Sequence, residues 1–209
     1  MWMNIFEYFY QTMYFLRKFK AWQERRLKIN FLIDLLRNSG VDKCWEYLDF
    51  AKNSIDTHDN IVGINLAGDE VKYPIEPYIP LIKKAKKESI MVSVHSGEWG
   101  NVYEIWSALD AGADRIGHGI RAVDDDSLLD KLSKESIPLE ICPTSNLYTG
   151  ASQNLSEISK LAKKEINLII NTDDPAIFNT TLEQELKIFK NVAKNYKFKP
   201  PLLFTKKHY

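Results

Sequence analysis

The sequence has few cysteines, no net charge and no apolar run long enough to cross a membrane, and each absence excludes a class of protein. Its two cysteines, Cys44 and Cys142, cannot build a disulfide framework, so we expect a reduced, cytoplasmic setting. The 28 basic residues are balanced by 28 acidic ones, which leaves no excess positive charge for nucleic acid or an anionic membrane. The expected partner is therefore a small molecule, and no oligomeric state is predicted.

Two nucleotide-binding motifs are also missing. The sequence contains neither G-x-G-x-x-G nor a P-loop, which argues against a doubly wound nucleotide binder. It contains no Gly- or Ser-rich linker, and 44% of its 209 residues are hydrophobic. Because a chain of this length can bury roughly 70% of its unfolded surface, we predict a single domain over residues 1–209.

Apolar runs alternate with amphipathic stretches of helical length through most of the chain. An aromatic helix is expected over residues 2–22, where polar and charged residues interrupt the apolar ones and exclude a membrane span or signal segment. Strands are then expected at 27–33, 61–66, 90–94, 115–116, 138–141 and 168–170. Helices are expected at 44–51, 78–87, 102–109, 127–133 and 155–162, with a last one around Leu186. Strand starts recur about every 30 residues, as in βαβ units, so the pattern predicts a parallel α/β sheet.

The expected strands run into polar residues at their carboxyl ends. In a β/α barrel these ends converge on one face, where several strands supply catalytic residues. His95 ends one strand and Glu98 follows three residues later, an arrangement suited to a metal ligand and a nearby proton carrier. The structural alternative is a histidine bonded to a backbone carbonyl and a glutamate that caps the helix beginning near Asn101.

Further candidates follow other strands. His118 lies between two glycines, which allow close approach of backbone or ligand; the alternative is a packed loop histidine. Asp173 and Asp174 follow an apolar run and can divide their work between metal and substrate, although Asp174 before Pro175 also fits a helix N-cap. Gly68 is suited to bring a backbone amide to a flat ligand, or is an ordinary glycine between strand and loop. Cys142 is expected to be a core thiol.

Five segments taken together resemble the adenosine deaminase family of metal-dependent hydrolases. They read V-G-I-N-L-A-G-D-E at 62–70, H-S-G-E at 95–98, R-I-G-H-G at 115–119, C-P-T-S-N at 142–146 and T-D-D-P at 172–175. The resemblance implies a zinc-containing (β/α)8 TIM barrel that converts adenosine or deoxyadenosine and water to inosine or deoxyinosine and ammonia. Its strands 3 to 8 are expected here, beginning near Leu27.

The same resemblance implies a role for each candidate. His95 and Asp173 match zinc ligands, with Asp173 also orienting the attacking hydroxide. Glu98 matches the acid that protonates purine N1, and His118 matches the histidine beside the hydroxide. Asp174 is similar to the residue that forms a hydrogen bond at purine N7, and Gly68 to the one whose amide meets N3 of the purine nucleoside.

The chain departs from the family pattern at two places. Ser96 stands where an alanine is usual, and no H-x-H pair, which supplies two further zinc ligands from the first strand, occurs in the sequence. We therefore expect an N-terminally truncated, incomplete barrel with lowered zinc affinity. Two alternatives to the adenosine deaminase remain open: a non-catalytic purine-binding or assembly remnant, and a deaminase of adenine or a modified adenosine monophosphate.

Overall fold

The computed structural model describes residues 29–58 and 60–197. The aromatic helix predicted at 2–22 lies outside these residues, as do the first two positions of the strand predicted at 27–33. The remaining predicted elements all fall within the described part of the chain.

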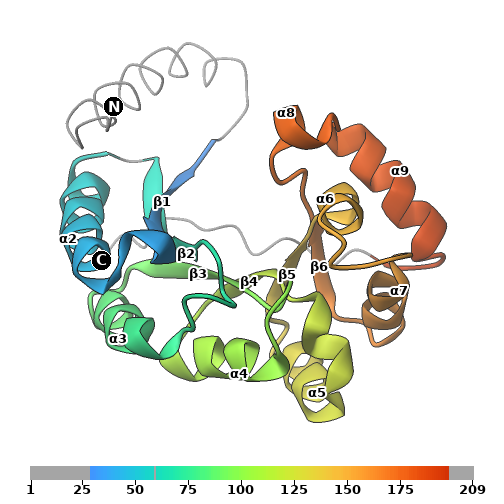
Figure 1. Cartoon of the computed structure of the whole chain (residues 1–209), viewed down its shortest axis with the longest axis horizontal. Helices are drawn as coiled ribbons and strands as arrows, with labels where there is room; N and C mark the ends of the chain where they lie inside the picture. The colour runs from blue at the N-terminus through green and yellow to red at the C-terminus, as the bar shows by residue number, and fades with distance from the viewer. Residues whose placement is uncertain (1–28, 59, 198–209) are drawn as a thin grey trace.

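Six parallel strands form the centre of the part of the chain that the structure describes. They are β1 (Phe31–Leu36), β2 (Ile61–Ala67), β3 (Met91–Ser96), β4 (Arg115–His118), β5 (Pro138–Ile141) and β6 (Asn167–Ile170), paired in that order along the sheet. Each strand pairs with the next one in sequence, as in a β/α barrel. Figure 1 shows the strands following a curve, with helices on its outer side. The predicted α/β fold with strands 3 to 8 of a barrel is confirmed.

Helices follow the strands, and most of the longer ones lie along the outer side of the sheet (Figure 1). They are α2 (Val41–Thr57), α3 (Ile79–Lys87), α4 (Val102–Ala111), α5 (Asp126–Lys134), α6 (Pro143–Tyr148), α7 (Ser156–Lys163), α8 (Pro175–Phe178) and α9 (Leu182–Val192), with 3-10 turns η1 (Arg37–Ser39), η2 (Glu76–Tyr78) and η3 (Ile120–Asp124). The strand runs are apolar because both faces are covered. Ile64, Val92 and Ile116, for example, are fully buried in successive strands.

The prediction of local elements was wrong at one strand and missed two helices. The strand predicted at 27–33 is β1 at Phe31–Leu36, because its position follows its pairing with β2, in which Leu36 lies beside Ala67. The short helices α6 and α8 begin at prolines directly after β5 and β6. Each has too few residues to show a helical repeat of apolar side chains. Both nevertheless carry or border residues of the candidate site.

Candidate functional site

The carboxyl ends of β3, β4, β5 and β6 bring their polar side chains together. His95 and Ser96 end β3, and Ser96 is paired in register with His118 at the end of β4. Asn146 follows β5 on α6, and Asp173 follows β6. Because neighbouring parallel strands end at the same edge, residues far apart in the sequence, such as Glu98 and Asn146, become neighbours.

His95 and Glu98 face each other across the turn that follows β3. Nε2 of His95 lies 3.6 Å from Oε2 of Glu98, and Glu98 is buried. The alternative role of Glu98 as a helix cap is wrong, because Asn101 caps α4 with its own side chain, which accepts from the amide of Tyr103 at 2.9 Å. Glu98 is therefore left to act inside the site.

His118 lies at the centre of the cluster. Its ring centroid is 4.6 Å from that of His95, its Nδ1 is 3.7 Å from Oε1 of Glu98, and its Nε2 is 3.8 Å from Oδ2 of Asp173. The residue has a φ of 60°, in the left-handed region that residues other than glycine rarely adopt. Such strain is typical of functional sites. A Cβ at Gly117 would lie 3.3 Å from Cα of His95, so this glycine lets β3 and β4 approach closely.

Asp173 and Asp174 separate at the end of β6. Asp173 also has a left-handed backbone, with φ of 56°, and its Oδ2 accepts a hydrogen bond from Oγ of Ser145 at 2.6 Å. Asp174 occupies the N-cap position of α8, with Pro175 next, but its side chain makes no capping hydrogen bond. Asp174 therefore stands at the N-cap position, as the alternative predicted, but its carboxylate does not cap the helix.

Gly68 follows β2 at the same edge of the sheet. Its φ of 105° requires a residue without a side chain, and a Cβ there would overlap Oδ1 of Asn38. The next amide, that of Asp69, donates to this same oxygen at 3.1 Å. Gly68 is therefore required by the turn itself, and its predicted role toward a purine stays a prediction.

Sequence reasoning missed three polar residues that hold the cluster together. Nδ2 of Asn146 lies 3.2 Å from Oε1 of Glu98 and 3.1 Å from Nδ1 of His118. Oγ1 of Thr149 donates to the same oxygen of Glu98 at 3.1 Å, and Ser145 holds Asp173. The signal was present in the polar run after Cys142, but its contacts depend on the turn into α6.

Burial shifts the proton affinities of the cluster in opposite directions. It raises the pKa of the Glu98 carboxyl above its usual value, although positive charge at His95 opposes this shift. It lowers the pKa of His118 and also that of His95, which the neighbouring His118 lowers further. Burial also raises the pKa of the Cys142 thiol well above its usual value, in agreement with the prediction of a core thiol. The site thus favours a carboxyl that can hold a proton beside neutral imidazoles.

The donor set fits a divalent transition metal. Two groups of side chains have ligand atoms within 4.8 Å of one another: His95, Glu98 and His118 form one, and His118, Cys142 and Asp173 form the other. Neutral imidazole nitrogen and carboxylate oxygen are common zinc ligands. His95 and Asp173, the two predicted ligands, fall in different groups, which are joined through His118.

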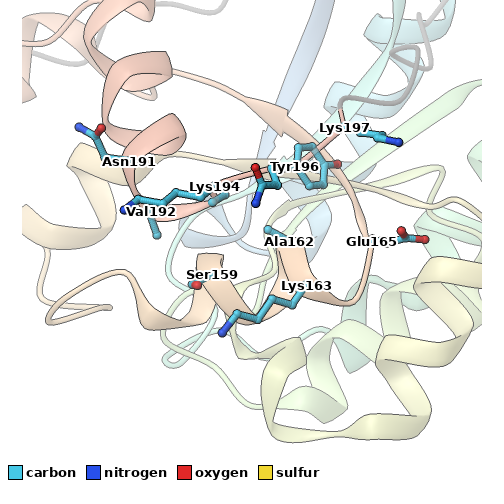
Figure 2. A pocket seen from close by; sticks show the side chains of 11 residues that line it. Ser159, Ala162, Lys163, Glu165, Asn191, Val192, Lys194, Tyr196 and Lys197 are labelled. Carbon is cyan, nitrogen blue, oxygen red and sulfur yellow. The ribbon is translucent and has the colours of Figure 1, made fainter.

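The cluster is separate from a cavity on the outer side of the sheet. That cavity, of about 810 Å³, lies between α7 and α9 and includes Lys163, Lys194 and Tyr196 in its lining (Figure 2). None of the predicted site residues lines it. Within residues 29–58 and 60–197, no helix combines the length and apolar character needed to cross a membrane.

Comparison with known proteins connects this arrangement to a family. Residues 20–197 match the family described as adenosine deaminase. An adenosine deaminase of Erwinia tasmaniensis is 35% identical over 155 residues, which are 73% of this chain and 46% of that protein. The chain spans about half the length of the curated relatives that it matches.

Solved structures share both the fold and part of the sequence. The adenine deaminase of Arthrobacter aurescens has a TM-score of 0.69 at 28% identity, covering 78% of this chain and 50% of its own. An Arabidopsis N6-mAMP deaminase has a TM-score of 0.71 at 28% identity, covering 78% of this chain and 48% of its own. The deaminases in this comparison act on different purine compounds, by their names.

Proposed function

This chain belongs to the adenosine deaminase family, and from that premise we propose that it carries much of a site for the hydrolytic deamination of adenosine or deoxyadenosine. In this reaction the bond from purine C6 to the amino nitrogen breaks, a bond from C6 to the oxygen of water forms, and ammonia leaves. The observation that carries the proposal is the buried Glu98 held beside His95 and His118, with Asp173 opposite.

Glu98 is the residue we assign to proton transfer at purine N1. Its Oε1 accepts hydrogen bonds from Asn146 and Thr149, which leaves Oε2 to carry a proton toward the substrate. Protonation of N1 withdraws electrons from C6 and makes that carbon easier to attack. General acid catalysis of this kind contributes about 10²–10⁴-fold in rate, and burial keeps the carboxyl ready to hold the proton.

His95 and Asp173 are the residues we assign to a zinc ion, with His118 between them. When bound, zinc lowers the pKa of water so that a nucleophile forms at neutral pH. Nε2 of His118 lies 3.8 Å from Oδ2 of Asp173, so this imidazole would be placed to take a proton from the attacking water and pass it to the leaving amine. We assign Asp174, whose carboxyl group makes no capping bond, to a hydrogen bond with purine N7, and the Gly68 amide to one with N3.

The charge at the site favours a nucleoside over a nucleotide. Asp173 and Asp174 are adjacent, and Asp34 on β1 lies near enough to Asp174 for their charges to interact. A phosphate placed beside these carboxylates would be repelled. The alternative substrates remain adenine and an N6-modified adenosine monophosphate, the classes named for the structural neighbours.

The test is production of inosine and ammonia from adenosine by the full chain with Zn²⁺. It is run alone and together with a segment that supplies the family's H-x-H strand. We expect product in at least the second preparation and its loss in Glu98→Gln, with adenine and N6-methyl-AMP converted more slowly. A folded chain that binds inosine in calorimetry but makes none in either preparation would instead be the non-catalytic purine-binding alternative.

A further inference from the structure

Glu70 lies beneath the turn that carries Glu98, and its carboxylate binds three consecutive backbone amides. The amide nitrogen of Gly97 is 2.6 Å from Oε2, and those of Glu98 and Trp99 are each 2.8 Å from Oε1. Glu70 is only 3% exposed. A buried charge normally needs compensation, and here consecutive amides of the turn provide it.

These amides change the chemistry of the carboxyl. Burial alone would raise the pKa of Glu70, but hydrogen bonds from the backbone of Gly100, Trp99 and Gly97 outweigh burial and hold the pKa below its usual value. The anion is packed closely: a Cβ on Gly100 would lie 2.7 Å from Oε2. The turn and the carboxylate therefore fit each other in both charge and shape.

A buried cation holds the other end of the same segment. Nη2 of Arg37 donates to the carbonyl oxygen of His95 at 2.9 Å, while Nη1 pairs with Glu104 at 3.0 Å. Arg37 thus meets a carbonyl, the negative end of the peptide dipole, and Glu70 meets amides, the positive end. The two anchors therefore fix the backbone at His95 and at Glu98.

We propose that Glu70 is a positioning residue that fixes the Gly97–Trp99 backbone and thereby aims the Glu98 carboxyl at the site, a role that rests on the proposed function. Two hydrogen bonds orient the Glu98 side chain: Nδ2 of Asn146 and Oγ1 of Thr149 both donate to its Oε1. These hydrogen bonds form only if the Glu98 backbone keeps the position in which Glu70 holds its amide. Glutamine at position 70 would direct an NH₂ group at N–H donors.

The test compares the full chain with its Glu70→Gln variant by ¹⁵N NMR and amide hydrogen exchange. Hydrogen bonds to a charged acceptor are roughly twice as strong as neutral ones. We expect the amide protons of Gly97, Glu98 and Trp99 to move upfield and to exchange about tenfold faster or more in the variant. The side-chain NH₂ resonances of Asn146 move as well, which a general loss of stability would not single out.

Glu185→Gln is the matched control, since Glu185 is fully buried and its Oε2 accepts the amide of Thr144 at 3.0 Å. That variant should leave the Gly97, Glu98 and Trp99 amides where they are. Unchanged amide and Asn146 signals in folded Glu70→Gln would overturn the proposal. If that variant does not fold, scalar coupling between the Glu98 amide nitrogen and the Glu70 carboxyl carbon in the unaltered chain decides, and its absence overturns the proposal. Lack of adenosine turnover would defeat the proposed function without altering these signals.

Discussion

Oγ of Ser145 lies 2.6 Å from Oδ2 of Asp173, so a residue of α6 holds the carboxylate that follows β6. Ser145 is buried and Asp173 has a strained, left-handed backbone. The hydrogen bond therefore restricts a side chain whose main chain is already constrained. It leaves the other carboxylate oxygen for a ligand.

Ser145→Ala is predicted to weaken Zn²⁺ binding. Partners that orient metal ligands typically contribute about 10–100-fold in metal affinity, and we expect a loss at the lower end, near tenfold. Isothermal titration with Zn²⁺ measures it. Ser127→Ala, in the first turn of α5, is the control; equal affinities of the unaltered chain and Ser145→Ala would contradict the assignment of Asp173.

Glu98→Gln is predicted to gain stability relative to the unaltered chain as pH rises. Burial raises the pKa of Glu98 from 4.5, so the folded state binds more protons than the unfolded state between these two pKa values. Its contribution to the free energy of unfolding is thus full below 4.5 and is lost as pH rises through the folded pKa. Glutamine does not ionise, and urea unfolding at about pH 5 and about pH 8 measures the difference.

Glu135→Gln, at an exposed position near the end of α5, is the control for this pH dependence. Its side chain is 49% exposed, so replacing this carboxyl does not relieve a buried charge. A Glu98→Gln difference that stays constant with pH, or that shrinks as pH rises, would contradict a raised pKa at Glu98.

His118→Gln is predicted to reduce the loss of stability in mild acid. Burial lowers the pKa of His118 below 6.5, so the unfolded state binds more protons between the folded pKa and 6.5. The free energy of unfolding therefore falls as pH drops below 6.5 and levels off below the folded pKa. Thermal unfolding measured in steps from about pH 7 to about pH 5 should give a shallower slope for the variant. An unchanged slope would mean that the imidazole is not buried in its neutral form.

Arg37→Met is predicted to destabilise the fold strongly. Arg37 is fully buried and pairs with Glu104 at 3.0 Å, so its loss leaves a buried carboxylate without its cation. Breaking such a pair costs about 3–5 kcal/mol. Urea unfolding measures the change, with Lys43→Met as the control, because the Lys43–Glu46 pair is exposed to solvent and should contribute little to stability.

Gly97→Ala is predicted to displace the turn after β3. Gly97 has a φ of 71°, and a Cβ there would overlap the side chain of Ile105. Overpacking of a core typically costs about 1–3 kcal/mol. Gly40→Ala is a useful control, since Gly40 also has a positive φ, of 87°, but a Cβ there meets no atom within 4 Å. Chemical denaturation should therefore show a larger loss for Gly97→Ala.

The pattern of the sequence by itself determined the order of the elements and the edge at which the site lies. Short apolar runs such as 61–66 can be buried on both faces only in a covered parallel sheet. The polar residues that follow them, His95 and Asp173 among them, must then gather at the carboxyl ends. These inferences succeed because each depends on contiguous residues and on a rule of topology.

Only the tertiary structure decided which side chains contact one another at the carboxyl ends of the strands. The start of β1 depends on its pairing with β2, so the strand lies at Phe31–Leu36 and the predicted 27–33 was displaced. The contacts of Asn146 with Glu98 and His118, and those of Glu70 with the amides after Gly97, join segments about 30 to 50 residues apart. Such contacts depend on the direction of each turn and on burial, which no short stretch of sequence encodes.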